Sequence, residues 1–197
     1  MGSCNSGGKG NGSGGSVNSV LGKKGRAKTP AEALANTNPN YKKGREYREN
    51  CQRCIFAMEA QMRGYDVEAL PATLKRNEPL FQYSTSWERG FIGQKWEKNL
   101  GNRSDAVEQN IVSKMQQWGN GSRAVAYVEW KGGNAHVFNI VNKGGKVSIF
   151  DGQDGKQYKL SDYLKNAKPS KTEISRVDNL QFNENVIKYA VKQRGKT

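Results

Sequence analysis

Three short β-prone runs in the second half of the chain constrain the fold more than any other feature. The runs are RAVAYVEW, AHVFNIVN and KVSIFD, and the glycine turns KGGN and KGG separate them. β-Branched and aromatic residues favour strands, and glycine pairs between such runs are typical of tight hairpin turns. The sequence therefore predicts an antiparallel sheet, followed by LSDYL as a short turn or helix and TEISRV as an edge strand.

The first half of the chain has helical periodicity instead. A helix is predicted to begin after Asn50, a favourable N-cap residue, and to stop at Gly64. Its apolar residues recur at helical spacing on one face, at Cys51, Ile55, Met58 and Met62.

Three further helices are predicted. They cover WERGFIGQKWEKN (87–99), the segment from Ser104 as cap to Gly119, and NENVIKYAVKQ (183–193). Residues 69–85 contain two prolines and indicate an irregular excursion. Helices that precede an antiparallel sheet place the chain in the α+β class.

Composition divides the chain of 197 residues into a tail and one domain. Residues 1–36 are rich in glycine, serine and basic residues, which predicts a flexible, basic linker. Residues 37–197 are numerous enough to bury a sufficient core. No run approaches the roughly 18 apolar residues of a membrane span, so no transmembrane segment is expected.

The chain is strongly basic, with 32 Lys and Arg against 18 Asp and Glu and a net charge of +14. Such a charge raises encounter rates with acidic partners. The basic residues are scattered, however, and no nucleic-acid-binding motif organises them. The charge therefore predicts non-specific contact with nucleic acid and no sequence-specific recognition.

The cysteine pair at the start of the first helix has several interpretations. A zinc site needs four ligands, usually as paired doublets, whereas this chain has three cysteines and one histidine. A redox pair usually follows a core strand, but the preceding YKKGREYRE is charged. Packing in the core fits Cys54 better than Cys51, since a free cysteine behaves as a small hydrophobe.

The nucleophile interpretation favours Cys51. At the first helical position, unpaired N–H groups and the helix dipole stabilise a thiolate. Nearby arginines add positive charge, and the same N–H groups can act as oxyanion donors. Cys54 lies almost a turn deeper and is the alternative nucleophile. The arginines are Arg45, Arg48 and Arg53.

His136 is the only imidazole that could serve as the base of such a thiol. If its strand pairs with KVSIFD about a two-residue loop, Gln153 lies opposite His136 and Asp151 lies one diagonal pair away on the same face. A register change of one residue would instead bring Gly152 opposite His136, and a further one would bring Asp151. A carboxylate or amide there could hold the ring in the tautomer that accepts a thiol proton. DGQDG could also be an ordinary polar turn, but the chain order Cys, His, Asp favours catalysis.

These segments together carry a family resemblance. NCQRCIFAMEAQMRGYDVEALP followed by AHVFNIVNKGGKVSIFDGQDGK resembles the papain-fold toxin, or glutamine deamidase, family. Members typically have an Asn-Cys-x-x-Cys helix start, a His-containing strand and an Asp-x-Gln-x-Gly strand end. The resemblance covers about residues 37–160 and implies a papain-like fold, with N-terminal helices packed on a small antiparallel sheet.

The resemblance also implies roles for individual residues. It maps the nucleophile to Cys51, the base to His136 and the orienting acid to Asp151. The supporting motif positions are Asn50, Cys54 and Gln153. Two departures from the pattern are Arg45, where papain-like proteases carry an oxyanion-hole glutamine six residues before the nucleophile, and Gly152, where proline is common.

The implied activity is thiol-dependent hydrolysis of a carboxamide, most directly glutamine deamidation of a target protein, with no cofactor or metal. Similar domains occur in polymorphic toxins and near the C-terminal end of phage minor head proteins. The resemblance thus implies a protein substrate, with phage head or portal proteins or a cognate immunity protein as further partners. It also implies a phage virion or a bacterial effector as the setting. A papain-like protease, a non-catalytic virion domain and a basic nucleic-acid-binding module remain alternatives.

Overall fold

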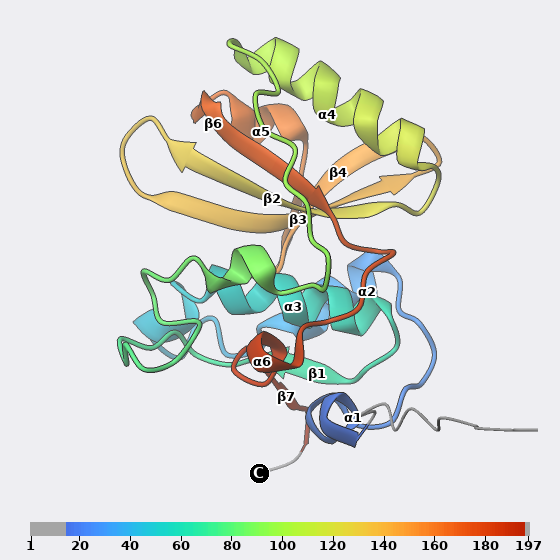
Figure 1. The fold of residues 1–197 in the computed structure, drawn as a ribbon, viewed down its shortest axis with the longest axis vertical. Coiled ribbons are helices and arrows are strands. Elements are labelled where there is room, and N and C mark those ends of the chain that lie inside the picture. The colour runs from blue at the N-terminus through green and yellow to red at the C-terminus, as the bar shows by residue number, and fades with distance from the viewer. Residues whose placement is uncertain (1–14, 196–197) are drawn as a thin grey trace, which may run out of the picture.

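The computed structural model describes residues 15–195 and is drawn in Figure 1. Its centre is a five-stranded sheet with strand order β5-β4-β3-β2-β6, in which every neighbouring pair is antiparallel. Helices cover both faces of this sheet, so the predicted α+β, papain-like class is confirmed. The strands are β2 (Arg123–Trp130), β3 (Ala135–Lys143), β4 (Lys146–Asp151), β5 (Lys156–Tyr158) and β6 (Ala167–Arg176).

The turn between β3 and β4 sets the register on which the site depends. Gly144 and Gly145 have φ values of 61° and 88°, which residues with a Cβ rarely adopt. They form a two-residue loop, because Lys143 pairs directly with Lys146. The predicted two-residue hairpin is therefore confirmed, and β6 lies at the sheet edge as TEISRV predicted.

One face of the sheet packs on α4 (Ser104–Trp118) and α5 (Leu160–Leu164). The predicted apolar face of α4 is confirmed, since Val107, Ile111 and Met115 are buried against the sheet. Ser104 is not the cap that the sequence predicted. Arg103 holds the N-cap position, and the Ser104 hydroxyl donates to the carbonyl of Leu164 in α5.

The other face of the sheet packs on α3 (Cys51–Met62), the most deeply enclosed helix. Every residue of α3 from Arg53 to Met62 is buried, because the sheet, α2 (Pro30–Thr37) and the C-terminal segment surround it. Asn139 of β3 donates from Nδ2 to the carbonyl of Ile55, which fixes the helix against the strand. This packing holds the first residue of α3 at one end of the sheet.

Two predicted helices are wrong. Residues 87–99 form only the 3₁₀ turn η2 (Ser86–Arg89) and irregular chain, since a Cβ at Gly90 would collide with the ring of Phe56 and Gly93 has a φ of 76°. The C-terminal helix is limited to α6 (Glu184–Ile187). It is followed by β7 (Val191–Gln193), which pairs with β1 (Val67–Ala69) in a second, two-stranded sheet.

The described part of the expected N-terminal linker packs on the domain. It contains α1 (Gly15–Leu21) and all of α2 except Thr37, and the turn η1 (Arg45–Tyr47) follows further along the chain. Leu21 and Leu34 are buried in two of the apolar clusters, and Thr29 forms a capping box with Glu32. Residues 1–14 of the predicted linker lie outside the described part. Among residues 15–195, no helix combines the length and the apolar character that crossing a membrane requires.

Candidate active site

Cys51 is the first residue of α3, as predicted, but Asn50 does not cap the helix with its side chain. The Asn50 side chain turns inward, where it exchanges hydrogen bonds with Asn38 and donates to the carbonyl of Leu70. Within residues 15–195, no hydrogen-bond acceptor lies at the backbone N–H of Cys51 or of Gln52. The start of α3 thus keeps two unused N–H donors beside the Cys51 thiol.

Cys54 has a different environment from Cys51, although both thiols are free. Its side chain is buried, and its thiol donates to Asn50 Oδ1 at 3.2 Å. Burial raises the pKa of the Cys54 thiol well above its ordinary value, and the charges of Asp151 and Cys51 act in the same direction. Cys54 is therefore a packing residue with a poor thiolate, whereas Cys51 is partly exposed.

His136 and Asp151 form a close pair across the β3–β4 hairpin. Because Asn139 pairs with Phe150, Asp151 falls level with Phe138, and His136 is its diagonal neighbour on the same side of the sheet. His136 Nε2 lies 2.6 Å from Asp151 Oδ2. This contact leaves Nδ1 as the ring nitrogen that can exchange a proton with another group.

Two further donors hold the Asp151 carboxylate. Tyr163 donates its hydroxyl to Oδ2 at 2.5 Å, and the backbone N–H of Gln153 donates to Oδ1 at 3.0 Å. Burial alone would raise the pKa of Asp151, but His136, Tyr163 and Gln153 together lower it below its ordinary value. Asp151 is therefore an ionised carboxylate with a fixed orientation.

His136 is buried, yet the pKa of its imidazole is raised. Burial acts to lower the pKa of the imidazole, and the charge and hydrogen bond of Asp151 outweigh it. A hydrogen bond and the charge of Cys51 raise the pKa further, so that it lies well above the ordinary value. A proton transferred from Cys51 would therefore be retained on the ring.

Aromatic rings enclose the imidazole. Trp130 stacks on His136 with ring centroids 6.1 Å apart, and Phe138 lies at 5.8 Å and Tyr163 at 6.1 Å from it. These rings exclude water from the His136–Asp151 pair, which strengthens the interaction between the two charges. His136 itself is only 9% exposed, and the cleft is the side from which it can be reached.

Cys51 and His136 line the same open cleft, with a volume of about 590 Å³. One wall is formed by the loop before η2, and Gln52 donates to the carbonyls of Gln82 and Ser84 there. The floor is aromatic, with Trp87 stacked on Tyr127 at 5.3 Å. Other residues that line the cleft are Arg45, Arg48, Tyr83, Trp130 and Gln153.

The arginines that the sequence placed near Cys51 differ in where they lie. Arg45 and Arg48 line the cleft, and Arg45 is paired with Glu49 at 2.6 Å. Arg53 points away from the cleft, contrary to the prediction. Its guanidinium is buried, binds the carbonyl of Tyr189 and lies 3.4 Å from Glu78.

Three residues of the site were not predicted from the sequence. Tyr163 and Trp130 surround the histidine, and Asn38 donates from Nδ2 to the carbonyls of Tyr47 and Gln153. Asn38 thereby ties the segment before Cys51 to the loop after Asp151. The two aromatic residues were visible in the sequence only as part of ordinary core patterns, and Asn38 only as part of a turn.

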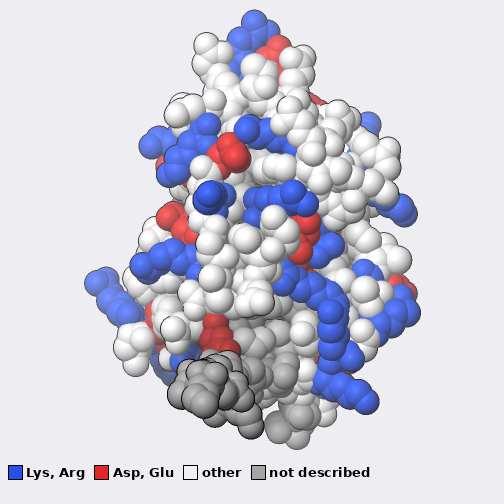
Figure 2. Space-filling view, turned by 45° about the vertical axis from the view of Figure 1, so that its right-hand side comes forward, with Lys and Arg blue, Asp and Glu red and all other residues white. Residues whose placement is uncertain are grey.

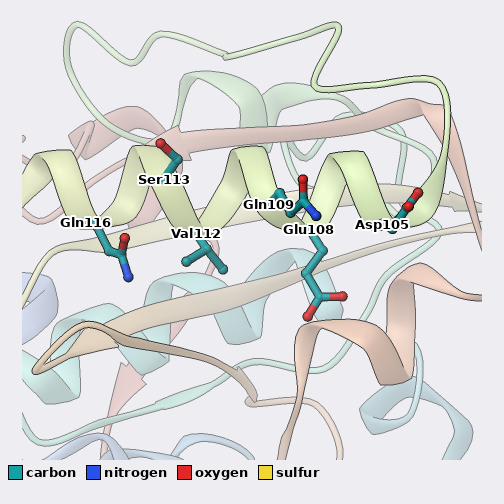
Figure 3. Close-up of a pocket in the computed structure, with 6 residues that line it drawn as sticks. All are labelled: Asp105, Glu108, Gln109, Val112, Ser113 and Gln116. Atoms are coloured by element: carbon teal, nitrogen blue, oxygen red, sulfur yellow. The ribbon is translucent and has the colours of Figure 1, made fainter.

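Other parts of the described surface differ from this cleft. On the face shown in Figure 2, Lys and Arg are spread over the surface with Asp and Glu between them. A hollow of about 390 Å³ is lined by one helix alone, and its side chains are acidic, amide, hydroxyl or valine groups of α4 (Figure 3). Within residues 15–195, no three His, Cys, Asp or Glu side chains come together as a metal site would require.

Comparison with known proteins identifies the domain. No curated protein and no solved structure matches the chain significantly. The profile of one family, described as papain fold toxin 1, glutamine deamidase, matches residues 49–156. This match spans more than half of the chain and contains α3, the β3–β4 hairpin and the His136–Asp151 pair. The chain therefore belongs to the papain-fold toxin 1, or glutamine deamidase, family.

Proposed function

We propose that the protein is a thiol amidohydrolase that converts glutamine side chains of a target protein to glutamate. Cys51 is the nucleophile, His136 the base and Asp151 the acid that orients the imidazole. The observation that carries this proposal is that His136, paired with Asp151 at 2.6 Å, lines one cleft with Cys51 at the start of α3. Membership of a glutamine deamidase family supports the carboxamide as the bond that is cleaved.

The reaction begins with proton transfer from the Cys51 thiol to His136 Nδ1. The thiolate then attacks the carbonyl carbon of the glutamine side chain, and the carbonyl π electrons move to oxygen. The free N–H groups of Cys51 and Gln52 are the backbone donors available to this oxyanion. Collapse of the intermediate re-forms the carbonyl, and the amide nitrogen takes the proton from His136 and leaves as ammonia.

Water completes the cycle. His136 accepts a proton from a water molecule as the water attacks the thioester carbon, and the second tetrahedral intermediate expels the Cys51 thiolate. The products are glutamate in the target protein and the free enzyme. Asp151 keeps Nε2 engaged throughout, so that Nδ1 carries each proton, and Tyr163 keeps the carboxylate in place.

The shape of the cleft supports a protein as the substrate. A cleft open to solvent, with Tyr83 exposed at its rim, suits a side chain presented by a protein surface. We extend the proposal to a protein partner that carries the reactive glutamine, encountered by a phage-borne or effector protein. A main-chain amide would make the same site a protease, and product analysis separates the two.

The decisive experiment compares Cys51→Ala with Cys54→Ala. Ammonia release from casein, with glutamine-to-glutamate conversion located by mass spectrometry, should vanish in Cys51→Ala. Cys54→Ala should retain turnover within a few-fold, since it changes packing rather than the nucleophile. Iodoacetamide should label Cys51 much faster than Cys54, because the Cys54 thiol is buried and its pKa is raised.

Each other outcome has a definite meaning. Turnover that persists in Cys51→Ala and disappears in Cys54→Ala would move the nucleophile to Cys54. New chain termini in casein without ammonia release would make the enzyme a protease. Equal and slow labelling of both thiols, with no turnover, would leave a non-catalytic domain.

A further inference from the structure

Gln153 has a side-chain amide that the protein does not use. Its Oε1 is buried without a hydrogen-bond partner, and within the described residues no hydrogen bond engages its Nε2. Buried amide oxygens without a partner are uncommon, because such an atom loses its hydration and gains no hydrogen bond in return. Since neither atom is bound, the amide can turn its NH₂ group without breaking any hydrogen bond within the protein.

This amide lies at the proposed catalytic centre. Gln153 lines the cleft together with Cys51 and His136. Its backbone is fixed on both sides, because its N–H donates to Asp151 Oδ1 at 3.0 Å and its carbonyl accepts from Asn38 Nδ2 at 2.8 Å. The backbone of Gln153 is therefore rigid while its side chain remains free.

The position of this loop relative to α3 is equally defined. Asn38 Nδ2 also donates to the carbonyl of Tyr47, and Asn38 Oδ1 accepts from Asn50 Nδ2, so one side chain joins residue 153 to the chain that enters α3. Gly152 packs so closely on the helix that an added Cβ would lie 2.7 Å from Thr37 Cγ2 and 3.3 Å from Cys54 Cβ. A Cβ at residue 152 would require the Thr37 side chain to shift, so glycine there lets the loop lie close against the start of α3.

A side-chain donor to the oxyanion is missing at Arg45, and the Gln153 amide can supply one. Six residues before Cys51 stands Arg45, whose guanidinium pairs with Glu49 at 2.6 Å. The position six residues before Cys51 therefore supplies no amide donor. The N–H groups of Cys51 and Gln52 are backbone donors, and a side-chain donor from the opposite wall would complete the set.

We propose that Gln153 is a catalytic residue that donates Nε2–H to the oxyanion formed when Cys51 attacks a carbonyl. This assignment rests on the proposed function, in that it requires Cys51 to add to a carbonyl group. It does not require the substrate to be glutamine. The side chain forms no covalent bond and transfers no proton, and its hydrogen bond strengthens as charge develops on the oxygen.

The test uses an aldehyde as the probe, so that it is independent of the substrate. Butyraldehyde adds to a reactive thiol as a thiohemiacetal: Sγ bonds to the carbonyl carbon, the carbonyl π electrons move to oxygen, and the thiol proton is transferred to that oxygen. The oxygen takes the position of the oxyanion. Its affinity for Cys51 is measured by NMR with the ¹³C-labelled aldehyde. The variants are Gln153→Ala and the similarly long Gln153→Met, with Gln109→Ala on the exposed surface of α4 as matched control.

Both Gln153 variants should bind butyraldehyde about 10- to 100-fold more weakly than the wild type, and Gln109→Ala should bind it as tightly. The rate of iodoacetamide labelling of Cys51 should stay within about twofold in all variants, because alkylation of a thiolate forms no oxyanion. On a deamidation substrate, kcat should fall about 10²-fold in the Gln153 variants with little change in KM.

The outcomes separate this assignment from the proposed function. Loss of aldehyde affinity without ammonia release from casein by the wild type would support Gln153 and reject casein glutamine as a substrate. Unchanged aldehyde affinity in both Gln153 variants would overturn the assignment, whatever the turnover. Cys51 labelling that slows in parallel with aldehyde binding would also overturn it, since Gln153 would then act on the thiol. A wild type that forms no adduct would reject the oxyanion site itself.

Discussion

At its N-terminal end α3 presents Cys51 to His136 and Asp151, while near its C-terminal end Glu59 binds Arg63 and Arg123. Both groups of charged side chains are largely buried. Glu59 has no exposed side-chain area, and its oxygens accept from Arg63 Nε at 2.7 Å and from Arg123 Nε at 2.7 Å. The Arg63 guanidinium also donates to the carbonyls of Leu180 and Val177.

The two ends differ in how completely their polar groups are used. At the Glu59 end, both carboxylate oxygens and both guanidinium groups are bound, and the cluster joins α3 to β2 and to the C-terminal segment. At the Cys51 end, two N–H groups and the Gln153 amide have no partner within the described residues. Polar groups whose hydrogen bonds are all made within the protein support the fold. Polar groups without a partner beside a cleft are available to a substrate.

The largest predicted effect is the loss of activity in His136→Gln, at the Cys51 end of α3. The amide can still donate to Asp151 but cannot accept the thiol proton, so kcat/KM should fall by about 10⁴-fold. The free energy of unfolding should change by about 1 kcal/mol or less, because a hydrogen bond to Asp151 is retained. Steady-state ammonia release and urea unfolding of the same preparation measure both quantities. A large loss of stability instead would mean that both ends of α3 are structural.

Glu59→Gln should have the opposite effect: it should lower stability and leave turnover nearly unchanged. Loss of the carboxylate leaves two largely buried guanidinium groups without their counter-charge, which should lower the free energy of unfolding by about 3–5 kcal/mol. The folded fraction should retain its turnover within a few-fold. Urea unfolding checks the stability, and Asp105→Asn, which breaks an exposed ion pair with Arg103, should leave the urea midpoint unchanged. Turnover lost ahead of unfolding would show that the two ends are coupled.

The hairpin that carries His136 and Asp151 could be predicted because its signals are local. Gly144 and Gly145 define the loop length, and loop length defines the register in which the two side chains share one face. Cys51 begins α3 as predicted, although the side chain of Asn50, on which that prediction rested, does not cap the helix. The parts of the site that depend on residues close in sequence could therefore be predicted.

The other parts of the site and fold depend on contacts between distant segments. Tyr163 and Asn38 reach the site from α5 and from the end of α2, and no spacing in the sequence relates them to Asp151. Residues 191–193 have a helical pattern, but they pair with β1 more than a hundred residues earlier. Tertiary partners decided these elements against local propensity.

A smaller effect on activity should come from Tyr163→Phe, which separates the role of the Tyr163 hydroxyl from that of its ring. The ring packing on Phe138 and Trp130 remains, and only the hydroxyl that binds Asp151 at 2.5 Å is lost. We expect kcat to fall about 10-fold, as for loss of one hydrogen bond to a charged group. The acid limb of the pH–rate profile should move to higher pH, because the Tyr163 hydrogen bond helps to lower the pKa of Asp151.

Tyr158→Phe is the matched control for this prediction. Its hydroxyl donates to Asp154 rather than to Asp151, so the pH–rate profile should keep its position. An identical change in both tyrosine variants would assign the effect to packing of the ring cluster. A fall in stability without a shift of the acid limb would give Tyr163 a purely structural role.

The smallest effect is the pH dependence of stability that the His136–Asp151 pair contributes. The pKa of His136 is raised by folding, so its contribution is complete below about pH 6.5, the unfolded value, and is lost as pH rises through the folded pKa. The pKa of Asp151 is lowered, so its contribution is complete above about pH 3.9 and is lost as pH falls through the folded pKa.

The stability difference between wild type and His136→Gln should therefore be greatest between about pH 4 and 6.5 and should shrink at alkaline pH. Urea midpoints of the two proteins at pH 5.5, 7.5 and 9 would measure it. The difference between wild type and Glu59→Gln should stay constant over the same range, because guanidinium groups keep their charge there. A His136 difference that is equally flat would mean that the ring is neutral in the folded protein and would remove the ion pair from the proposed mechanism.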